Sequence, residues 1–453
     1  MDKIMTPQSE IRQAAEPSHK DGGPLNHLTI SVLVFLVVFV GHFTSGNITS
    51  TDSRWTVYTA MSVIKEGDTD LDEYEDMLKT YNYIYTEKDI RPHLYYIYPI
   101  GVSVIAVPFV FVIDQVLVRM VGFDLEGYIK HTIPGGVEVF IASFIVGLTA
   151  IFVYSIARLS LDRKYSLLVV FIFAFGTSAW STASRALWTH GPSILMLSMT
   201  LYLVLLARQK PRLIQFASIP LAFSYAVRPS NSIAVLLLTI FVLIQYREYF
   251  WRYLLWAMTI AVPFLLFNVA IYDSLLPPYF QPAPDYSHFL EALAGNLISP
   301  ARGLFVLSPI LLFSIGGVIL RIRENRWDRL DYFLLAIILL HWIGISSLPG
   351  WWAGHSFGPR YMTDMIPYFT YFLIPVVGQI SQLNVRKVAL ASVGKLAFAA
   401  VFYGLIAISF FVHYQGATDS DVWAWNSKPV DIDLQPGRVW DWDDMQFLRG
   451  VRN

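Results

Sequence analysis

Apolar runs of membrane length alternate with short polar connections along most of the chain. An α-helix rises about 1.5 Å per residue, so roughly 20 apolar residues are needed to cross the hydrocarbon core of a bilayer. The pattern predicts about eleven spanning helices, near residues 27–44, 136–157, 165–183, 191–207, 213–227, 231–246, 254–272, 303–320, 331–348, 365–380 and 396–414. A further apolar segment, LYYIYPIGVSVIAVPFVFVID, covers residues 94–114. The prediction is an all-α polytopic membrane protein.

Composition narrows the class of protein further. The 453 residues are 55% hydrophobic and 15% charged, whereas soluble domains carry about 25% charged residues. The net charge of −1 gives no basic surface for nucleic acid, so we expect no nucleic-acid partner. The chain has no cysteine, which excludes disulfides, thiolate metal sites and cysteine nucleophiles.

Lysine and arginine are unevenly divided between the two alternating sets of connections after residue 135. Basic residues are retained on the cytoplasmic side of a membrane. The richer set is therefore predicted to be cytoplasmic, and the other set, which holds Arg185, Arg228, Arg302 and Arg360, extracytoplasmic. The richer set comprises Arg158, Arg163, Lys164, Arg208, Lys210, Arg212, Arg247, Arg252, Arg321, Arg323, Arg326, Arg329, Arg386, Lys387 and Lys395.

This assignment bears on the segment 94–114. If the N-terminus is cytoplasmic, as its few basic residues favour, the loop after the first span is outside and the span 136–157 runs inward. Segment 94–114 then cannot cross, and must be re-entrant or lie at the interface, where Pro99 and Pro108 would let it bend. The alternative topology keeps 94–114 as a span, with the N-terminus outside.

The predicted organisation has three parts. Residues 1–26 are polar and predicted to be a disordered cytoplasmic tail. Residues 27–414 form the transmembrane domain, with an outer loop from 45 to 135, and residues 415–453 form an extracytoplasmic tail. Tryptophans among the acidic residues of that tail would either stack on sugar rings or, as we expect, pack against the bundle.

Each short outer connection brings one arginine, often beside an aromatic residue or a histidine, as in SRALWTHGPS and GWWAGHSFGPRYMTD. The guanidinium is always charged and offers a planar fork to phosphate oxygens. Four such groups at one membrane face would suit a phosphate-bearing ligand, with His190 and His355 as secondary candidates for phosphate contact or proton transfer. Alternatively, the arginines reach headgroups or pair with nearby carboxylates.

Asp52 opens the stretch DSRWTVYTAMSVIKEG, which predicts a helix capped by Ser50 or Thr51 and stopped by Gly67. A carboxylate at a helix start is favoured by the helix dipole, which is one explanation for it. The other is a general base at the membrane surface, kept ionised by an arginine such as Arg54.

The nearby acidic run GDTDLDEYED begins like a calcium-binding loop. It then departs from that pattern, because Glu73 replaces the turn glycine and Lys79 occupies the position of the final bidentate glutamate. We therefore predict no metal ligands there. The cofactor stays undefined, and nothing in the sequence supports a divalent cation.

The order of these features resembles the GT-C superfamily of polyprenyl-phosphate-dependent glycosyltransferases, whose relatives include protein O-mannosyltransferases and the aminoarabinose transferase of lipid A modification. The local match is DSRWTVYTAMSVIKEGD, followed by HLYYIYPIGVSVIAVPF, and then by the stretches around SRALWTHGPS and SPARGLFVLSP. The resemblance covers residues 45–210 and 299–368. One departure is that the family often has an acidic pair, whereas Ser53 follows Asp52 here.

The resemblance implies an integral-membrane glycosyltransferase in a bacterial plasma membrane with an extracytoplasmic active site. A polyprenyl-phosphate sugar would be the donor, its phosphate held by the outer arginines. A glycan, lipid or protein would be the acceptor, and Asp52 the general base of an inverting transfer. The alternatives are a transporter or flippase of a lipid-linked sugar, and a polysaccharide polymerase or ligase. Transporters often contain internal repeats, and none is evident.

Overall fold

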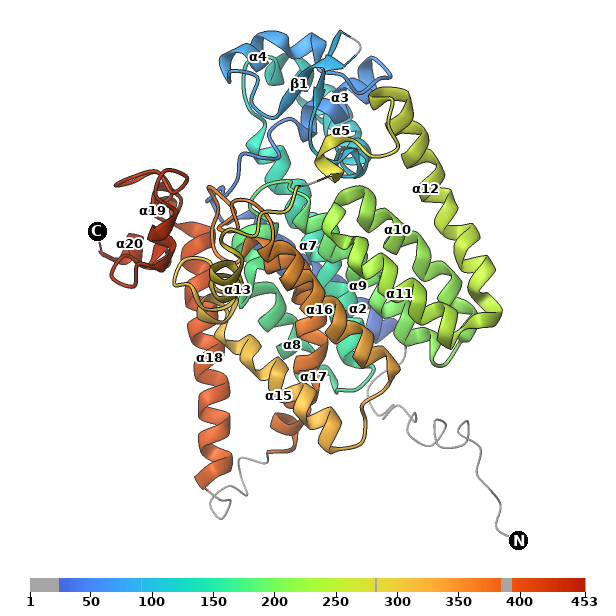
Figure 1. Cartoon of the computed structure of the whole chain (residues 1–453), viewed down its shortest axis with the longest axis vertical. Coiled ribbons are helices and arrows are strands. Elements are labelled where there is room, and N and C mark those ends of the chain that lie inside the picture. The colour runs from blue at the N-terminus through green and yellow to red at the C-terminus, as the bar shows by residue number, and fades with distance from the viewer. Residues whose placement is uncertain (1–23, 91, 282, 384–392, 453) are drawn as a thin grey trace.

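A computed structural model describes residues 24–90, 92–281, 283–383 and 393–452. Most of the predicted cytoplasmic tail, and Arg386 and Lys387 of the basic set, lie outside these residues. Within them the chain is almost entirely helical, as Figure 1 shows. This is the architecture of an all-α polytopic membrane protein.

Seven helices in the described chain are long and apolar enough to cross a membrane. Six match predicted spans to within about four residues at each end. These are α2 (Pro24–Phe43), α7 (Gly135–Arg158), α9 (His190–Ala207), α12 (Phe250–Tyr272), α16 (Arg329–Ser346) and α18 (Val393–Thr418). The seventh is α5 (Ile100–Val121).

The other predicted spans are shorter or interrupted, so the total of about eleven stays a prediction. The span predicted at 165–183 is α8 (Arg163–Phe175) followed by a π-helical turn at Ala179–Ala183, and the span at 303–320 is broken around Pro309. Proline cannot donate the backbone hydrogen bond that a continuous helix needs. The remaining helices of this group are α10 (Ser218–Val227), α11 (Ser232–Gln245), α14 (Leu304–Leu307), α15 (Leu312–Arg323) and α17 (Ile366–Gln382).

Close helix packing holds the bundle together. Helices α2 and α7 pack along much of their length, and so do α15 and α17. At the second contact Gly317 is required, because a Cβ atom there would lie 1.6 Å from the Phe372 carbonyl oxygen. Interiors are close-packed, so any larger residue at this position would force α15 away from α17.

Above the bundle, the residues between α2 and α7 form a small outer domain (Figure 1). It contains α3 (Thr56–Lys65), α4 (Glu75–Thr80), α5, α6 (Leu125–Ile129) and a two-stranded antiparallel sheet, β1 (Thr86–Ile90) with β2 (His93–Tyr96). This strand pair is the one part of the described fold that departs from the all-α prediction. Its apolar residues, which include Trp55, Tyr58 and Tyr74, form one buried cluster with residues of the bundle such as Ile141 and Leu195.

Helix α5 packs mainly on α3 and not along the bundle. In Figure 1 it is viewed nearly along its own axis at the top of the molecule, whereas α18 runs vertically. The Lys65 ammonium pairs with the buried Asp114 carboxylate of α5 at 3.0 Å. Because α5 is one of the helices long and apolar enough to span, its placement at the membrane interface stays a prediction. The segment predicted at 94–114 divides into the end of β2 and this helix.

Helix α3 starts later than the sequence indicated. It begins at Thr56, with no side-chain cap, so the predicted cap at Ser50 or Thr51 is wrong. The predicted stop is confirmed, since Gly67 has a φ of +82° just beyond the last turn. Asp52 therefore lies in a turn before the helix, outside the first helical turn where the dipole acts most strongly.

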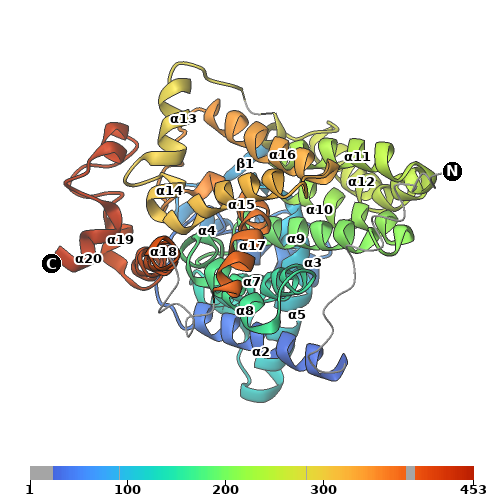
Figure 2. The ribbon, with the colours of Figure 1, turned by 90° about the horizontal axis from the view of Figure 1, so that it is seen from below.

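The C-terminal segment after α18 packs on the side of the bundle, where Figures 1 and 2 show α19 (Ser420–Ala424) and α20 (Arg449–Arg452). Its buried residues Trp425, Ile432 and Val439 form a cluster with Trp351 and Ala292. The expectation that tryptophans of this tail pack against the bundle is confirmed for Trp425, which is fully buried.

Candidate active site

Asp52 lies where the outer domain meets the bundle. The Ser50 hydroxyl accepts the backbone N–H of Asp52 at 3.0 Å, and the hydroxyl of Tyr96 in β2 donates to the Asp52 carbonyl oxygen. These two contacts fix the backbone from opposite sides. The carboxylate is 15% exposed, so it can be reached by a ligand while most of its surroundings are protein.

Two further tyrosines contact the Asp52 carboxylate. The hydroxyls of Tyr85 and Tyr98 hydrogen-bond to it, and their rings are in edge contact, with centroids 5.5 Å apart. Burial alone would raise the pKa of Asp52, but the Arg360 guanidinium outweighs burial and, with these hydroxyls, holds the pKa below its usual value. Asp52 is therefore a carboxylate at neutral pH.

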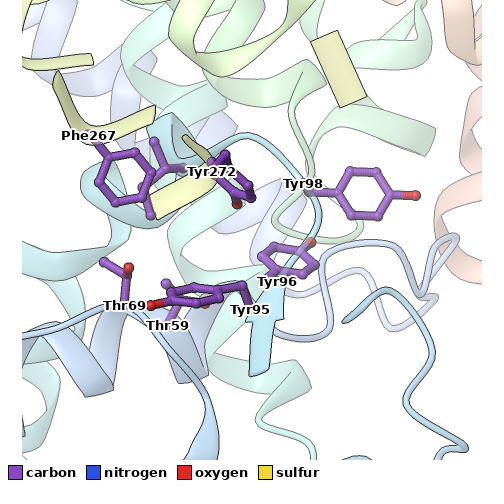
Figure 3. Close-up of a pocket in the computed structure, with 8 residues that line it drawn as sticks. Thr59, Thr69, Tyr95, Tyr96, Tyr98, Phe267 and Tyr272 are labelled. Atoms are coloured by element: carbon purple, nitrogen blue, oxygen red, sulfur yellow. The ribbon is translucent and has the colours of Figure 1, made fainter. Parts of the chain in front are cut away.

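A small hollow adjoins these tyrosines. Its cavity volume is about 10 Å³, far below the roughly 300 Å³ at which ligand pockets begin. In Figure 3 the Tyr98 side chain turns away from Tyr95, Tyr272 and Phe267, which line the other side. Tyr98 thus points out of the hollow, and the hollow itself is too small to be the binding site of a whole lipid-linked sugar.

Arg360 is the partner of Asp52. The two form an ion pair although they are 308 positions apart in the chain. Arg360 also donates to the Ala353 carbonyl at 3.3 Å, and its guanidinium lies 4.0 Å from the centre of the Trp188 ring. Burial disfavours the charged guanidinium, but the Asp52 carboxylate outweighs that effect and raises the pKa of Arg360 above its ordinary value.

His190 lies behind Arg360, at the first residue of α9. Arg360 Nε donates to His190 Nε2 at 3.4 Å. A guanidinium can only donate, so Nε2 accepts and the ring proton is on Nδ1. Nδ1 faces the Asp364 carboxylate at 3.3 Å. This geometry makes His190 a neutral imidazole whose tautomer is set by Asp364.

Arg228 completes the cluster from the end of α10. Its Nε lies 2.6 Å from Asp364 Oδ2, and its Nη1 donates to the Thr189 hydroxyl at 2.9 Å. Burial opposes the charge on Asp364, but Arg228 and then His190 outweigh it and hold the pKa of that carboxyl below its usual range. Five residues from four separate parts of the chain are thereby linked in the order Asp52, Arg360, His190, Asp364 and Arg228.

The residues of this series, which we call the site chain, differ in exposure, and Arg228 at its end is 7% exposed. The side chains of Asp52 and Arg360 are 15% and 11% exposed, while those of His190 and Asp364 are fully buried. The exposed pair can contact a ligand. The buried pair, His190 and Asp364, can only orient Arg360 and Arg228.

The structure does not bring Arg185 into the site chain. Arg185 is fully buried, and its guanidinium donates to the carbonyl oxygens of His42 and Ser45 at the end of α2. The last carbonyls of a helix lack partners within that helix, and Arg185 satisfies them. Burial lowers the pKa of this guanidinium.

Arg302 is also apart from the site chain, although it contacts the loop that precedes Arg360. Its guanidinium donates to the carbonyls of Trp352 (2.7 Å) and Gly354 (3.1 Å) and to the side chains of Gln446 (2.6 Å) and Asn426 (3.0 Å). These acceptors belong to the loop before Arg360 and to the C-terminal segment. Arg302 therefore joins those two segments.

The remaining secondary candidates point elsewhere. Arg54 lies over the Tyr81 ring at 4.1 Å, inside the outer domain. His355 Nε2 contacts the Asp431 carboxylate of the C-terminal segment at 2.9 Å. Only His190 of the secondary candidates takes part in the site chain.

Two clusters of described residues have ligand atoms close enough to hold a cation. One is His355 with Asp431 and Asp433, and the other is Asp70 with Asp72 and His93; within each, all ligand atoms lie within 4.8 Å. The second includes part of the acidic run for which we predicted no metal ligands. Neither cluster includes a residue of the site chain.

Sequence reasoning missed Asp364, Trp188 and the tyrosines Tyr85 and Tyr98. The signal for Asp364 was its place four residues after Arg360 in GPRYMTDM, where a short 3₁₀ segment (Arg360–Met365) brings both to one region. For the tyrosines it was their density between residues 81 and 98.

A scan against models of protein families and a search of curated proteins each returned no match to this chain.

Proposed function

We propose that this protein is an integral-membrane glycosyltransferase of the GT-C type. It would transfer a sugar from a polyprenyl-phosphate donor to an acceptor hydroxyl or amine on the extracytoplasmic side. The observation that carries the proposal is the partly exposed Asp52–Arg360 pair at the end of an apolar bundle. Its carboxylate is suited to act as a general base and its guanidinium to bind a phosphate.

In the proposed reaction Asp52 takes the proton of the acceptor as the acceptor oxygen or nitrogen bonds to the anomeric carbon of the sugar. The bond from that carbon to the phosphate oxygen breaks, and the electron pair leaves with the lipid phosphate. Attack from the face opposite the leaving group inverts the anomeric centre. The Arg360 guanidinium stabilises the negative charge that grows on the phosphate, a contribution that is large in enclosed sites.

The other residues of the site chain hold this arrangement. Trp188 lies against the Arg360 guanidinium, and the imidazole of His190 accepts from Arg360 Nε, so the guanidinium plane is fixed. Arg228 neutralises Asp364 from behind. We retain Arg228 as a supporting cation for the phosphate. Arg185 and Arg302, whose donors are used within the protein, are not part of the proposal.

The test is a transfer assay with purified protein, a polyprenyl-phosphate sugar and an acceptor pool, following release of free lipid phosphate. We expect wild-type protein to release it and Asp52→Asn to lose on the order of 10²–10³ in turnover, as for removal of a key group in other enclosed sites. Normal elution and melting of the variant in detergent would show that it folds.

Two outcomes would count against the proposal. Near-normal turnover by Asp52→Asn would remove Asp52 as the base. Movement of the donor across proteoliposomes with no release of lipid phosphate would favour a flippase, and a strict preference for a pyrophosphate-linked donor would favour a polymerase or ligase.

A further inference from the structure

Glu138 is a buried acid that the proposed reaction does not use. It lies in the first turn of α7 and is 5% exposed. Its Oε2 accepts the Ser53 hydroxyl at 2.5 Å and approaches the backbone N–H of Leu187 at 3.4 Å. Both partners are neutral groups. Burying a carboxyl group costs free energy unless it is hydrogen-bonded, and these two groups supply the hydrogen bonds.

The two partners belong to opposite halves of the site. Ser53 directly follows Asp52 in the outer domain. Leu187 directly precedes Trp188, whose ring lies against the Arg360 guanidinium. Glu138 Oε2 therefore contacts the sequence neighbours of two site residues. Ser53 is next to Asp52, the proposed base, and Leu187 is next to Trp188, which lies against Arg360.

We propose that Glu138 is a positioning residue that sets the separation of Asp52 and Arg360. This inference rests on the proposed function. The structure brings the Glu138 side chain of α7 into a hydrogen bond with Ser53, the residue next to Asp52. The outer domain is joined to α2 by residues 44–55, a segment without regular helix or strand, and the Ser53–Glu138 hydrogen bond ties this segment to α7 directly beside Asp52.

The role predicts a particular pattern of mutant effects. Misplacing reacting groups by about 1 Å can cost on the order of 10²-fold in rate. We expect Glu138→Ala and Ser53→Ala each to lower kcat by about 10- to 100-fold, with little change in the KM for the donor. Glu138→Gln keeps an acceptor oxygen of the same reach, so we expect it to retain kcat within about tenfold of wild type.

The chain offers a matched control. The hydroxyl of Ser62 in α3 donates to the Glu73 carboxylate, which is the same chemical pair at a position away from the site chain. Glu73→Ala and Ser62→Ala remove a comparable contact from the same domain. We expect both to leave kcat unchanged, which separates positioning from a general loss of stability.

A second readout does not depend on turnover. The chain has no cysteine, so spin labels can be attached at Asp76→Cys of α4 and Leu290→Cys of α13 (Phe289–Ile298), both exposed. Distances between them report how the outer domain sits on the bundle. We expect a narrow distribution in the otherwise unchanged protein and in Glu138→Gln, and a broader one in Glu138→Ala and Ser53→Ala.

The outcomes are distinct. Broadening together with a loss of kcat that Glu138→Gln rescues supports the inference. If Glu138→Gln is as slow as Glu138→Ala while the distances stay narrow, Glu138 acts in the chemistry and the positioning role is wrong; full activity of Glu138→Ala also overturns it. If the distances broaden but wild-type protein transfers no sugar, the proposed function fails and the positioning role stands.

Discussion

Arg360 and Arg302 are both arginines of the loops near the outer domain, and both donate to carbonyl oxygens of the loop 347–359. Arg360 is paired with a carboxylate and remains partly exposed. Arg302 is 2% exposed, and its donors end on carbonyl and amide oxygens of the protein itself. The same side chain in similar sequence surroundings therefore has two different roles.

The difference shows how partners decide what a buried arginine can do. A guanidinium whose N–H groups are used by the backbone has none to offer a ligand, and exchanging those bonds would leave buried acceptors unpaired. A guanidinium paired with one accessible carboxylate can contact a phosphate at the same time, because it has five donors. This difference supports the proposed ligand-binding role of Arg360, whereas Arg302 joins two segments of the protein.

The largest expected effect that tests this comparison is on turnover. Arg360→Gln removes the charge next to the leaving phosphate, and we expect a loss on the order of 10²–10³ in transfer rate. The measurement is lipid-phosphate release under saturating donor. Retention of more than a tenth of wild-type turnover would mean that Arg360 is not the main phosphate ligand.

The matching substitution at the other arginine should act on stability. Arg302→Gln leaves several buried oxygens without donors, each costing about 1–3 kcal/mol, so we expect a clear fall in the melting temperature in detergent. Turnover per folded molecule should stay within about threefold. Arg449→Gln is the control, because Arg449 forms a more exposed ion pair with Asp444, and such pairs contribute about 0–1 kcal/mol.

The comparison also marks what could be predicted from the sequence. Long apolar runs predicted α7, α9, α12, α16 and α18 well, because length and hydropathy are local properties. The break after α8 was not predicted. There the Thr177 hydroxyl donates to the Phe173 carbonyl and accepts the backbone N–H of Ala179, and such local side-chain bonds compete with helical ones.

The site was predicted only in part, for a related reason. Asp52, Arg360, Arg228 and His190 could be proposed from residue type and loop position. Nothing local distinguishes Arg185 from Arg360, since both follow short apolar segments and have aromatic neighbours. What distinguishes them is the identity of groups 140 or more positions away in the chain, which one sequence does not reveal.

The smallest expected effect is a change in pH dependence. Arg360 lowers the pKa of Asp52, so the wild-type acid limb of kcat/KM should lie below the usual carboxyl range near pH 4. Without the guanidinium the carboxylate loses its favourable partner and buried surroundings raise its pKa. We expect the residual activity of Arg360→Gln to fall off at a higher pH than that of wild type.

Arg302→Gln gives the contrast for this measurement. Arg302 contributes no contact to Asp52, so its removal should leave the acid limb where wild type has it. An acid limb that moves equally in both variants would mean that general destabilisation at low pH controls the profile. A limb that moves in neither would mean that Asp52 is not the titrating base, and the distinction between the two arginines would then rest on turnover and melting alone.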